Sequence, residues 1–108
     1  MAVVRYREAM ELAGVPPTRP FANVGYLQAM EIAEGLRACG FPCRGADMQR
    51  ALDGLRFDTE GFASGSVGFS TDNHEALDTV SFYVWDEASR SVVEAAAGVP
   101  AGGPPGSQ

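Results

Sequence analysis

The stretch Ala38-Cys39-Gly40-Phe41-Pro42-Cys43 separates two runs of residues with helical periodicity. Gly40 stands where a helix commonly ends in a left-handed residue, and Pro42 favours a turn. We expect a disulfide between Cys39 and Cys43 if the protein is exported, and two partly buried free thiols if it remains in a reducing cell. In either state the stretch predicts a tight connection between two helices.

The residues around this connection predict three amphipathic helices. The first helix is expected to end at Gly14, before the Pro16-Pro17 pair, and Asn23 is expected to be the N-cap of the second. Asp47 lies in the first turn of the third helix, where a carboxylate complements the helix dipole. The three apolar faces consist of Val3, Tyr6, Met10 and Ala13; of Leu27, Met30, Ala33 and Leu36; and of Met48, Ala51, Leu52 and Leu55.

The pattern changes after the third helix. Residues 56–76 are rich in Gly, Ser, Thr and Asp and predict a loop with an irregular β-hairpin. Residues 79–85 are β-branched and aromatic and form the clearest strand in the sequence. A turn at 86–89 and a short returning strand at 91–94 should follow, and residues 98–108 have the composition of a disordered Gly/Pro tail. Because a lone hairpin is marginal and three amphipathic helices need a surface to cover, this inventory favours an additional sheet that the chain does not supply.

The composition excludes several functions. The net charge of −6 argues against a nucleic-acid surface, and no apolar run approaches the roughly 20 residues of a membrane span. Two cysteines at Cys-x3-Cys spacing with a single histidine, His74, lack the ligands of a zinc site, so we expect no metal and no cofactor. The sequence has charged residues near its start, Arg5, Arg7 and Glu8, and lacks the apolar segment of a signal peptide there. This start predicts a cytoplasmic protein if the sequence is complete and predicts nothing if it is a fragment.

The sequence offers only weak candidates for catalysis. His74 with Asp72 suggests acid–base chemistry, and Asp58 with Glu60 suggests paired carboxylates, but all four lie in expected turns. No serine or cysteine nucleophile is patterned beside them. We therefore expect solvated turns and a protein that is not an enzyme.

Several blocks resemble, in order, the last third of the extracytoplasmic solute-binding proteins related to the leucine/isoleucine/valine-binding protein. Residues 33–40 (Ala-Glu-Gly-Leu-Arg-Ala-Cys-Gly) are close to that family's "ala-glu-ala-leu-lys-ala-cys-gly", although Val67 stands where a proline is usual and Asn73 replaces an acid. The resembling blocks are Tyr6–Met10 with Gly14 and Pro17, Phe21–Ala29, Ala33–Gly40, Gln49–Leu55, Phe57–Gly61 followed by Ser64–Ser70, Asp72–His74, and Ser81–Asp86.

The resemblance implies an α/β fold, the C-terminal portion of a two-lobe type I periplasmic binding protein. Residues 1–97 would be its last segment: mostly N-terminal-lobe helices up to residue 78, then a lobe-crossing strand at 79–86 and an edge strand of the other lobe at 90–95. Family members capture a small amino acid or amide by lobe closure, without chemistry, and dock on a membrane ABC permease outside the cytoplasm. The first two-thirds of such a protein is absent from this sequence.

The resemblance also implies which residues contact the ligand. Phe21 corresponds to a side-chain pocket position, with loop packing as its alternative. Tyr26 is a weaker candidate, because packing in the lobe core with its hydroxyl bonded to the backbone also explains it. Two other functions remain open: an amide-sensing regulatory receptor of the same fold, and a free-standing interaction module that self-associates through strand 79–86.

Overall fold

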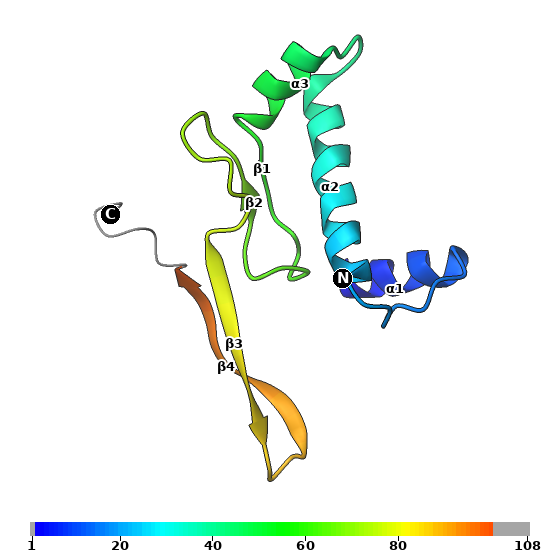
Figure 1. The fold of residues 1–108 in the computed structure, drawn as a ribbon, viewed down its shortest axis with the longest axis vertical. Helices are drawn as coiled ribbons and strands as arrows, with labels where there is room; N and C mark the ends of the chain where they lie inside the picture. Colours follow the sequence, from blue (N-terminus) through cyan, green and yellow to red (C-terminus); the bar gives the residue numbers. More distant parts are fainter. Residues whose placement is uncertain (1, 101–108) are drawn as a thin grey trace.

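The computed structural model describes residues 2–100, which form three helices followed by two small antiparallel sheets (Figure 1). This mixed content is compatible with the predicted α/β class. The elements are α1 (Ala2–Leu12), α2 (Ala22–Cys39), α3 (Gly45–Leu52), β1 (Arg56–Phe57), β2 (Val67–Gly68), β3 (Thr79–Asp86) and β4 (Ser91–Pro100). We call residues 2–78 the helical body and residues 79–100 the hairpin.

Helix α2 begins earlier than the sequence predicts. Phe21 is its N-cap, at φ 63°, and makes no side-chain capping hydrogen bond. The predicted cap, Asn23, lies inside the helix, so that prediction was wrong. The reason is the preceding turn: the Ala22 N–H donates to the Arg19 carbonyl at 3.1 Å, and the Gly25 N–H donates to the Phe21 carbonyl at 3.1 Å. The chain is therefore already wound before Asn23 is in a position to cap it.

The connection from α2 to α3 follows the prediction closely. Gly40 has a positive φ of 73°, although its ψ of −165° is extended rather than left-handed helical, and its N–H donates to the Leu36 carbonyl at 3.0 Å. Asp47 lies in the first turn of α3, and its Oδ2 accepts a hydrogen bond from the Arg44 backbone N–H at 3.1 Å. That bond satisfies a backbone donor at the start of α3 that the helix itself cannot pair.

Helices α2 and α3 cross at a position without a side chain. Gly35 is the buried residue of α2, and a Cβ atom there would lie 2.9 Å from both Leu52 Cδ2 and Met48 Cε of α3. Real Cβ atoms do not approach carbon so closely. The glycine therefore lets the apolar face of α3 lie directly against α2.

Three aromatic rings form the centre of the helical body. Tyr6 of α1, Tyr26 of α2 and Phe62 of the loop after β1 have ring centroids 5.1–5.3 Å apart, at angles typical of edge and tilted contacts. The Tyr6 hydroxyl donates to the Pro17 carbonyl at 2.6 Å, which ties α1 to the Pro-rich loop before α2. Tyr6 is therefore buried and hydrogen-bonded at once.

A buried threonine closes the loop between β1 and β2. Val67 and Thr59 are the fully buried side chains of this region. The Thr59 hydroxyl donates to the Gly65 carbonyl at 2.9 Å and accepts the Ala63 N–H at 3.1 Å. This side chain thereby pairs backbone groups that a two-residue sheet leaves without partners.

The hairpin extends away from the helical body (Figure 1). Strand β4 is longer than the predicted return at 91–94, because β3 offers it a ladder as far as the Thr79–Pro100 pair. Residues 98–100 of the predicted tail are thus part of the strand, and residues 101–108 lie outside the described range. The Thr79 hydroxyl, at the start of β3, donates to the Ser64 carbonyl of the helical body at 2.9 Å.

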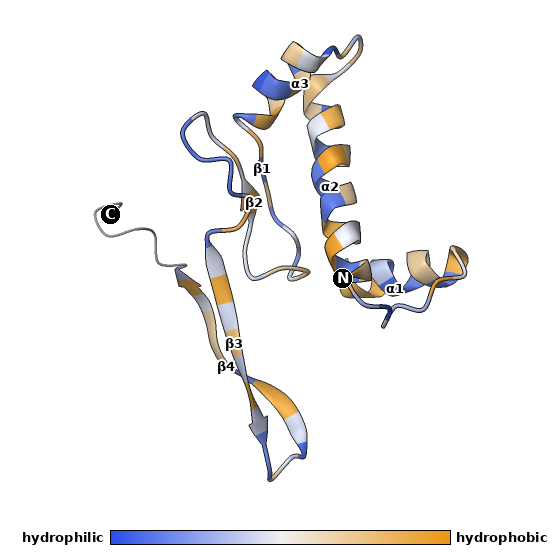
Figure 2. Cartoon of the chain, in the orientation of Figure 1, coloured by the Kyte–Doolittle hydropathy of each residue, from blue (hydrophilic) through white to orange (hydrophobic). Residues whose placement is uncertain are grey.

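The molecule exposes an unusually large surface, which includes many large apolar side chains. Its accessible surface is 8050 Å², whereas a compact 11.4 kDa monomer exposes about 5,800 Å². Full exposure of every residue outside the described range would account for only about 1,100 Å² of this surface by unfolded-chain scaling. Apolar residues lie along both strands of the hairpin and along α2 (Figure 2). Those of the hairpin, 38–63% exposed, are Val80, Phe82, Tyr83, Val84, Trp85, Val92 and Val93.

Candidate functional site

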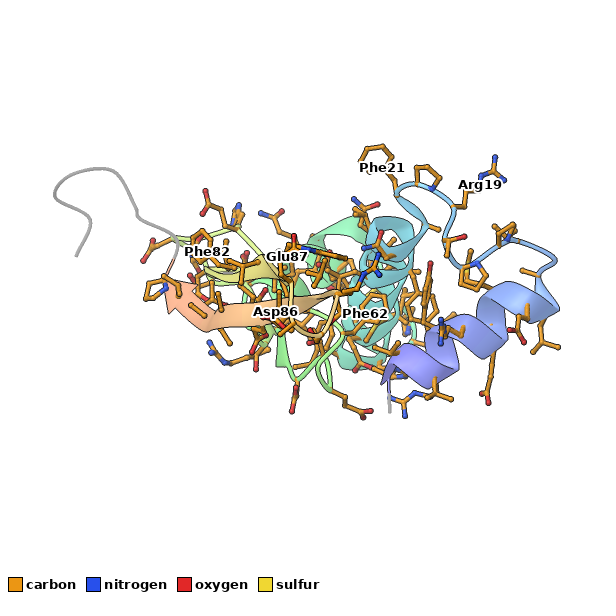
Figure 3. All side chains as sticks on the ribbon, turned by 90° about the horizontal axis from the view of Figure 1, so that it is seen from below. Arg19, Phe21, Phe62, Phe82, Asp86 and Glu87 are labelled. Carbon is orange, nitrogen blue, oxygen red and sulfur yellow. A yellow bond between two sulfur atoms is a disulfide. The ribbon has the colours of Figure 1, made fainter. Side chains whose placement is uncertain are left out.

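The two predicted ligand residues lie in different surroundings. Phe21 is 81% exposed in the loop before α2 and projects away from the helical body (Figure 3). Tyr26 is half-buried against Tyr6 and Phe62, in agreement with the packing alternative. The hydroxyl that bonds to the backbone belongs to Tyr6 rather than Tyr26. The fold does not bring Phe21 and Tyr26 together around one cavity, and their assignment as ligand residues stays a prediction.

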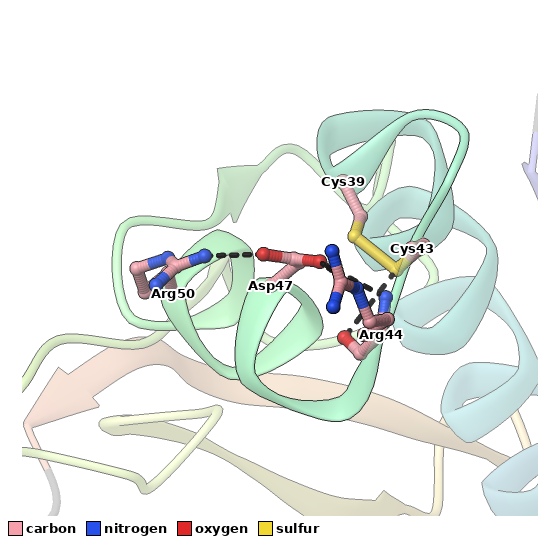
Figure 4. Close-up of a disulfide and its surroundings, with 5 residues drawn as sticks. All are labelled: Cys39, Cys43, Arg44, Asp47 and Arg50. Carbon is pink, nitrogen blue, oxygen red and sulfur yellow. Dashed lines mark hydrogen bonds and ion pairs between the residues drawn. A yellow bond between two sulfur atoms is a disulfide. The ribbon is translucent and has the colours of Figure 1, made fainter.

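Cys39 and Cys43 form a disulfide that joins the end of α2 to the start of α3 (Figure 4). Beside it, the Asp47 carboxylate pairs with Arg50 one turn further along α3 and with the backbone of Arg44. This corner is a structural brace, since both sulfur atoms are bonded to each other, the Asp47 carboxylate is paired, and no free thiol remains among the described residues.

The single histidine makes a contact that the sequence did not predict. His74 Nε2 lies 3.3 Å from Asp53 Oδ1 at the end of α3, instead of pairing with its neighbour Asp72. The His74 side chain is 68% exposed, whereas that of Asp53 is 26% exposed. Only the tertiary fold brings the loop after β2 against α3, so the sequence carried no signal for this pair.

Two cavities flank this contact. A polar one of about 250 Å³ lies between β1, β2 and the loop after β2, and includes Arg56, Asn73 and Glu75. A more apolar one of about 480 Å³ lies against α3. Its lining residues are Gly45, Met48, Gln49, Leu52, Asp53, Phe69 and His74.

Two carboxyl groups have shifted pKa values, and neither borders these cavities. Partial burial raises the pKa of Glu31 on α2. Hydrogen bonds from Ser89 lower the pKa of Asp86 at the hairpin turn, where the Ser89 N–H lies 2.8 Å from Asp86 Oδ2. Both shifts are local effects of packing and turn geometry and indicate no paired acid and base.

Residues 2–100 contain no group of three or more His, Cys, Asp or Glu side chains placed to hold a metal ion. None of the helices formed by these residues is both long and apolar enough to cross a membrane. No family model, no curated protein and no solved structure matches this chain.

Proposed function

We propose that this chain is the C-terminal part of a two-lobed, non-enzymatic receptor that captures a small amino acid or amide and delivers it to a membrane ABC permease. The proposal combines the ordered sequence blocks with one structural observation. The hairpin is apolar on both faces: Tyr83 and Trp85 point to one side of β3, and Phe82 and Val84 alternate with them. Strands with this pattern are usually covered on both sides by helices or sheets.

The disulfide supports an extracytoplasmic location in this proposal. Disulfides persist in secreted and periplasmic proteins and are rare in the cytosol of most organisms. The Cys39–Cys43 bond encloses a short loop on the surface of the molecule, where a reducing environment would open it. The proposed receptor would carry this bond in its N-terminal lobe.

The proposal is tested by the size and location of the native gene product. An antibody raised against residues 2–100 is used on fractionated source cells. A band several times heavier than 11.4 kDa in the extracytoplasmic or membrane fraction is the expected result. A single soluble band at 11.4 kDa would overturn it. Titration calorimetry adds a second check: the 108-residue chain should bind leucine weakly or not at all, and micromolar binding would contradict the proposal.

A second candidate function is self-association through the hairpin. One edge of β3 pairs with β4, and its other edge pairs with no strand among residues 2–100. Residues 79–85 of that strand carry no charge, so no side-chain charge within this stretch opposes pairing with another copy. Sedimentation equilibrium of the chain distinguishes this candidate by a concentration-dependent dimer. The amide-sensing receptor differs from the transport receptor by its gene neighbours, because permease and ATPase genes favour transport.

A further inference from the structure

The 480 Å³ cavity beside α3 combines an apolar floor with one carboxylate. Met48 and Leu52 of α3 and Phe69 after β2 supply the apolar surface, and Asp53 stands at its rim. A volume of this size falls within the usual range for small-molecule sites, about 300–1,000 Å³. The cavity therefore has the composition of a site for a small ligand with one polar group.

The surrounding backbone fixes the position of these side chains. The Phe69 N–H donates to the Leu55 carbonyl at 2.9 Å, which holds Phe69 next to the end of α3. The Asp53 N–H donates to the Gln49 carbonyl at 3.0 Å, so Asp53 is the C-cap residue of that helix. The apolar floor and the carboxylate are thus held by main-chain hydrogen bonds and do not depend on a flexible loop tip.

The charge of the site selects the polar group of the ligand. Asp53 contributes the one carboxylate of the lining, and His74 contacts only its Oδ1. Within the described residues, Asp53 Oδ2 accepts no hydrogen bond from a protein group. Because a carboxylate is acceptor-only, a group that binds here must donate, and a cationic donor gains most.

We propose that this cavity binds a small, mostly apolar primary amine, with the ammonium group on Asp53 and the apolar part against Met48, Leu52 and Phe69. The site lies wholly within the helical body, so it does not depend on the receptor proposed above. The cavity is open to solvent, and the ligand is small. We expect a dissociation constant of about 1 mM for a single-ring amine.

The test is a ¹H–¹⁵N correlation NMR titration of the 108-residue chain with phenethylamine. Its anionic counterpart, 3-phenylpropionate, has the same ring and a similar length and serves as the matched ligand. Phenethylamine should shift the amide signals of Gly45–Asp53, Phe69 and His74, and 3-phenylpropionate should shift them at least tenfold less at equal concentration. Absence of saturable shifts up to 10 mM, equal shifts with both ligands, or shifts centred elsewhere would each overturn the proposal.

Two variants distinguish binding of the amine at this cavity from non-specific attraction of a cation to an acidic protein. Asp53→Asn keeps the shape and the C-cap position and should weaken phenethylamine binding by about tenfold or more, as expected for loss of a charged hydrogen-bond partner. Glu87→Gln removes the same charge at the hairpin turn, far from the cavity, and should leave binding unchanged. Equal weakening by both variants would show non-specific attraction and would refute the site.

Discussion

The helical body packs three aromatic residues against one another, whereas the hairpin leaves most of its large apolar residues exposed. In the body, Tyr6, Tyr26 and Phe62 cover one another and the Tyr6 hydroxyl is hydrogen-bonded. In the hairpin, Phe82 and Trp85 are more than half exposed, although residues 79–85 are rich in β-branched and aromatic residues and form the clearest strand in the sequence. The difference shows that local sequence preference and burial are separate properties: the hairpin has the pairing pattern of a core strand without the surrounding core.

Truncation of the central tyrosine should have the largest effect. Tyr6→Ala removes a buried ring from the aromatic cluster and should lower the free energy of unfolding by about 3–5 kcal/mol. Far-UV circular dichroism in urea reports this change, since the helices give most of that signal. Tyr6→Phe is the matched control and should cost only about 1 kcal/mol, the contribution of the hydroxyl bond to Pro17. Equal costs for both variants would mean that the ring is not packed as described.

Loss of the disulfide should have the next largest effect, and it should be confined to the helical body. The bond closes a loop with a sequence separation of 4, and the chain-entropy model assigns such a loop about 2 kcal/mol. Cys39→Ser with Cys43→Ser should lower the free energy of unfolding by this amount in urea denaturation under oxidising conditions. Reduction of the wild-type chain should have the same effect, and reductant should not change the double variant.

Substitution in the hairpin should change stability least. Trp85 is 56% exposed and faces Val92 across the ladder, so Trp85→Arg should alter the free energy of unfolding by about 1 kcal/mol or less. If the hairpin self-associates, the same substitution should abolish the dimer in sedimentation equilibrium. Glu8→Gln, on the exposed side of α1, makes the same change of +1 in net charge and serves as the control. A large loss of stability in Trp85→Arg would contradict the contrast between the two regions.

The smallest effects are two opposite pKa shifts, one in each region. Carboxyl NMR titration should place the pKa of Glu31 above the ordinary value of a glutamate and the pKa of Asp86 below the ordinary value of an aspartate. For Asp86 the folded pKa is lowered, so its contribution to stability is present above the unfolded pKa and is lost as pH falls through the folded pKa. For Glu31 the folded pKa is raised, so the folded state becomes less favoured as pH rises through the unfolded value. Shifts in the same direction would contradict these environments.

Sequence reasoning succeeded where the signal was local. The turn at Gly40, the position of Asp47 and the strand over 79–85 all depend on neighbouring residues, and the structure has each of them. It failed where distant residues decide the outcome. Strand β4 extends to Pro100 because β3 lies beside it, and His74 meets Asp53 only because the loop after β2 folds back on α3. The apolar cavity shares that origin, since its lining comes from segments separated by the β1–β2 loop.

The crossing at Gly35 has a consequence for insertions and deletions. Gly35 and Cys39 are four residues apart on α2 and so lie on the same side of the helix, one turn from each other. Gly35 lies directly against α3, and Cys39 is bonded to Cys43, two residues before α3 begins. A single residue inserted between them would rotate Cys39 by about 100° relative to Gly35, and both attachments would no longer reach α3 together. The segment between Gly35 and Cys39 should therefore accept exchanges of exposed side chains far more readily than any change in its length.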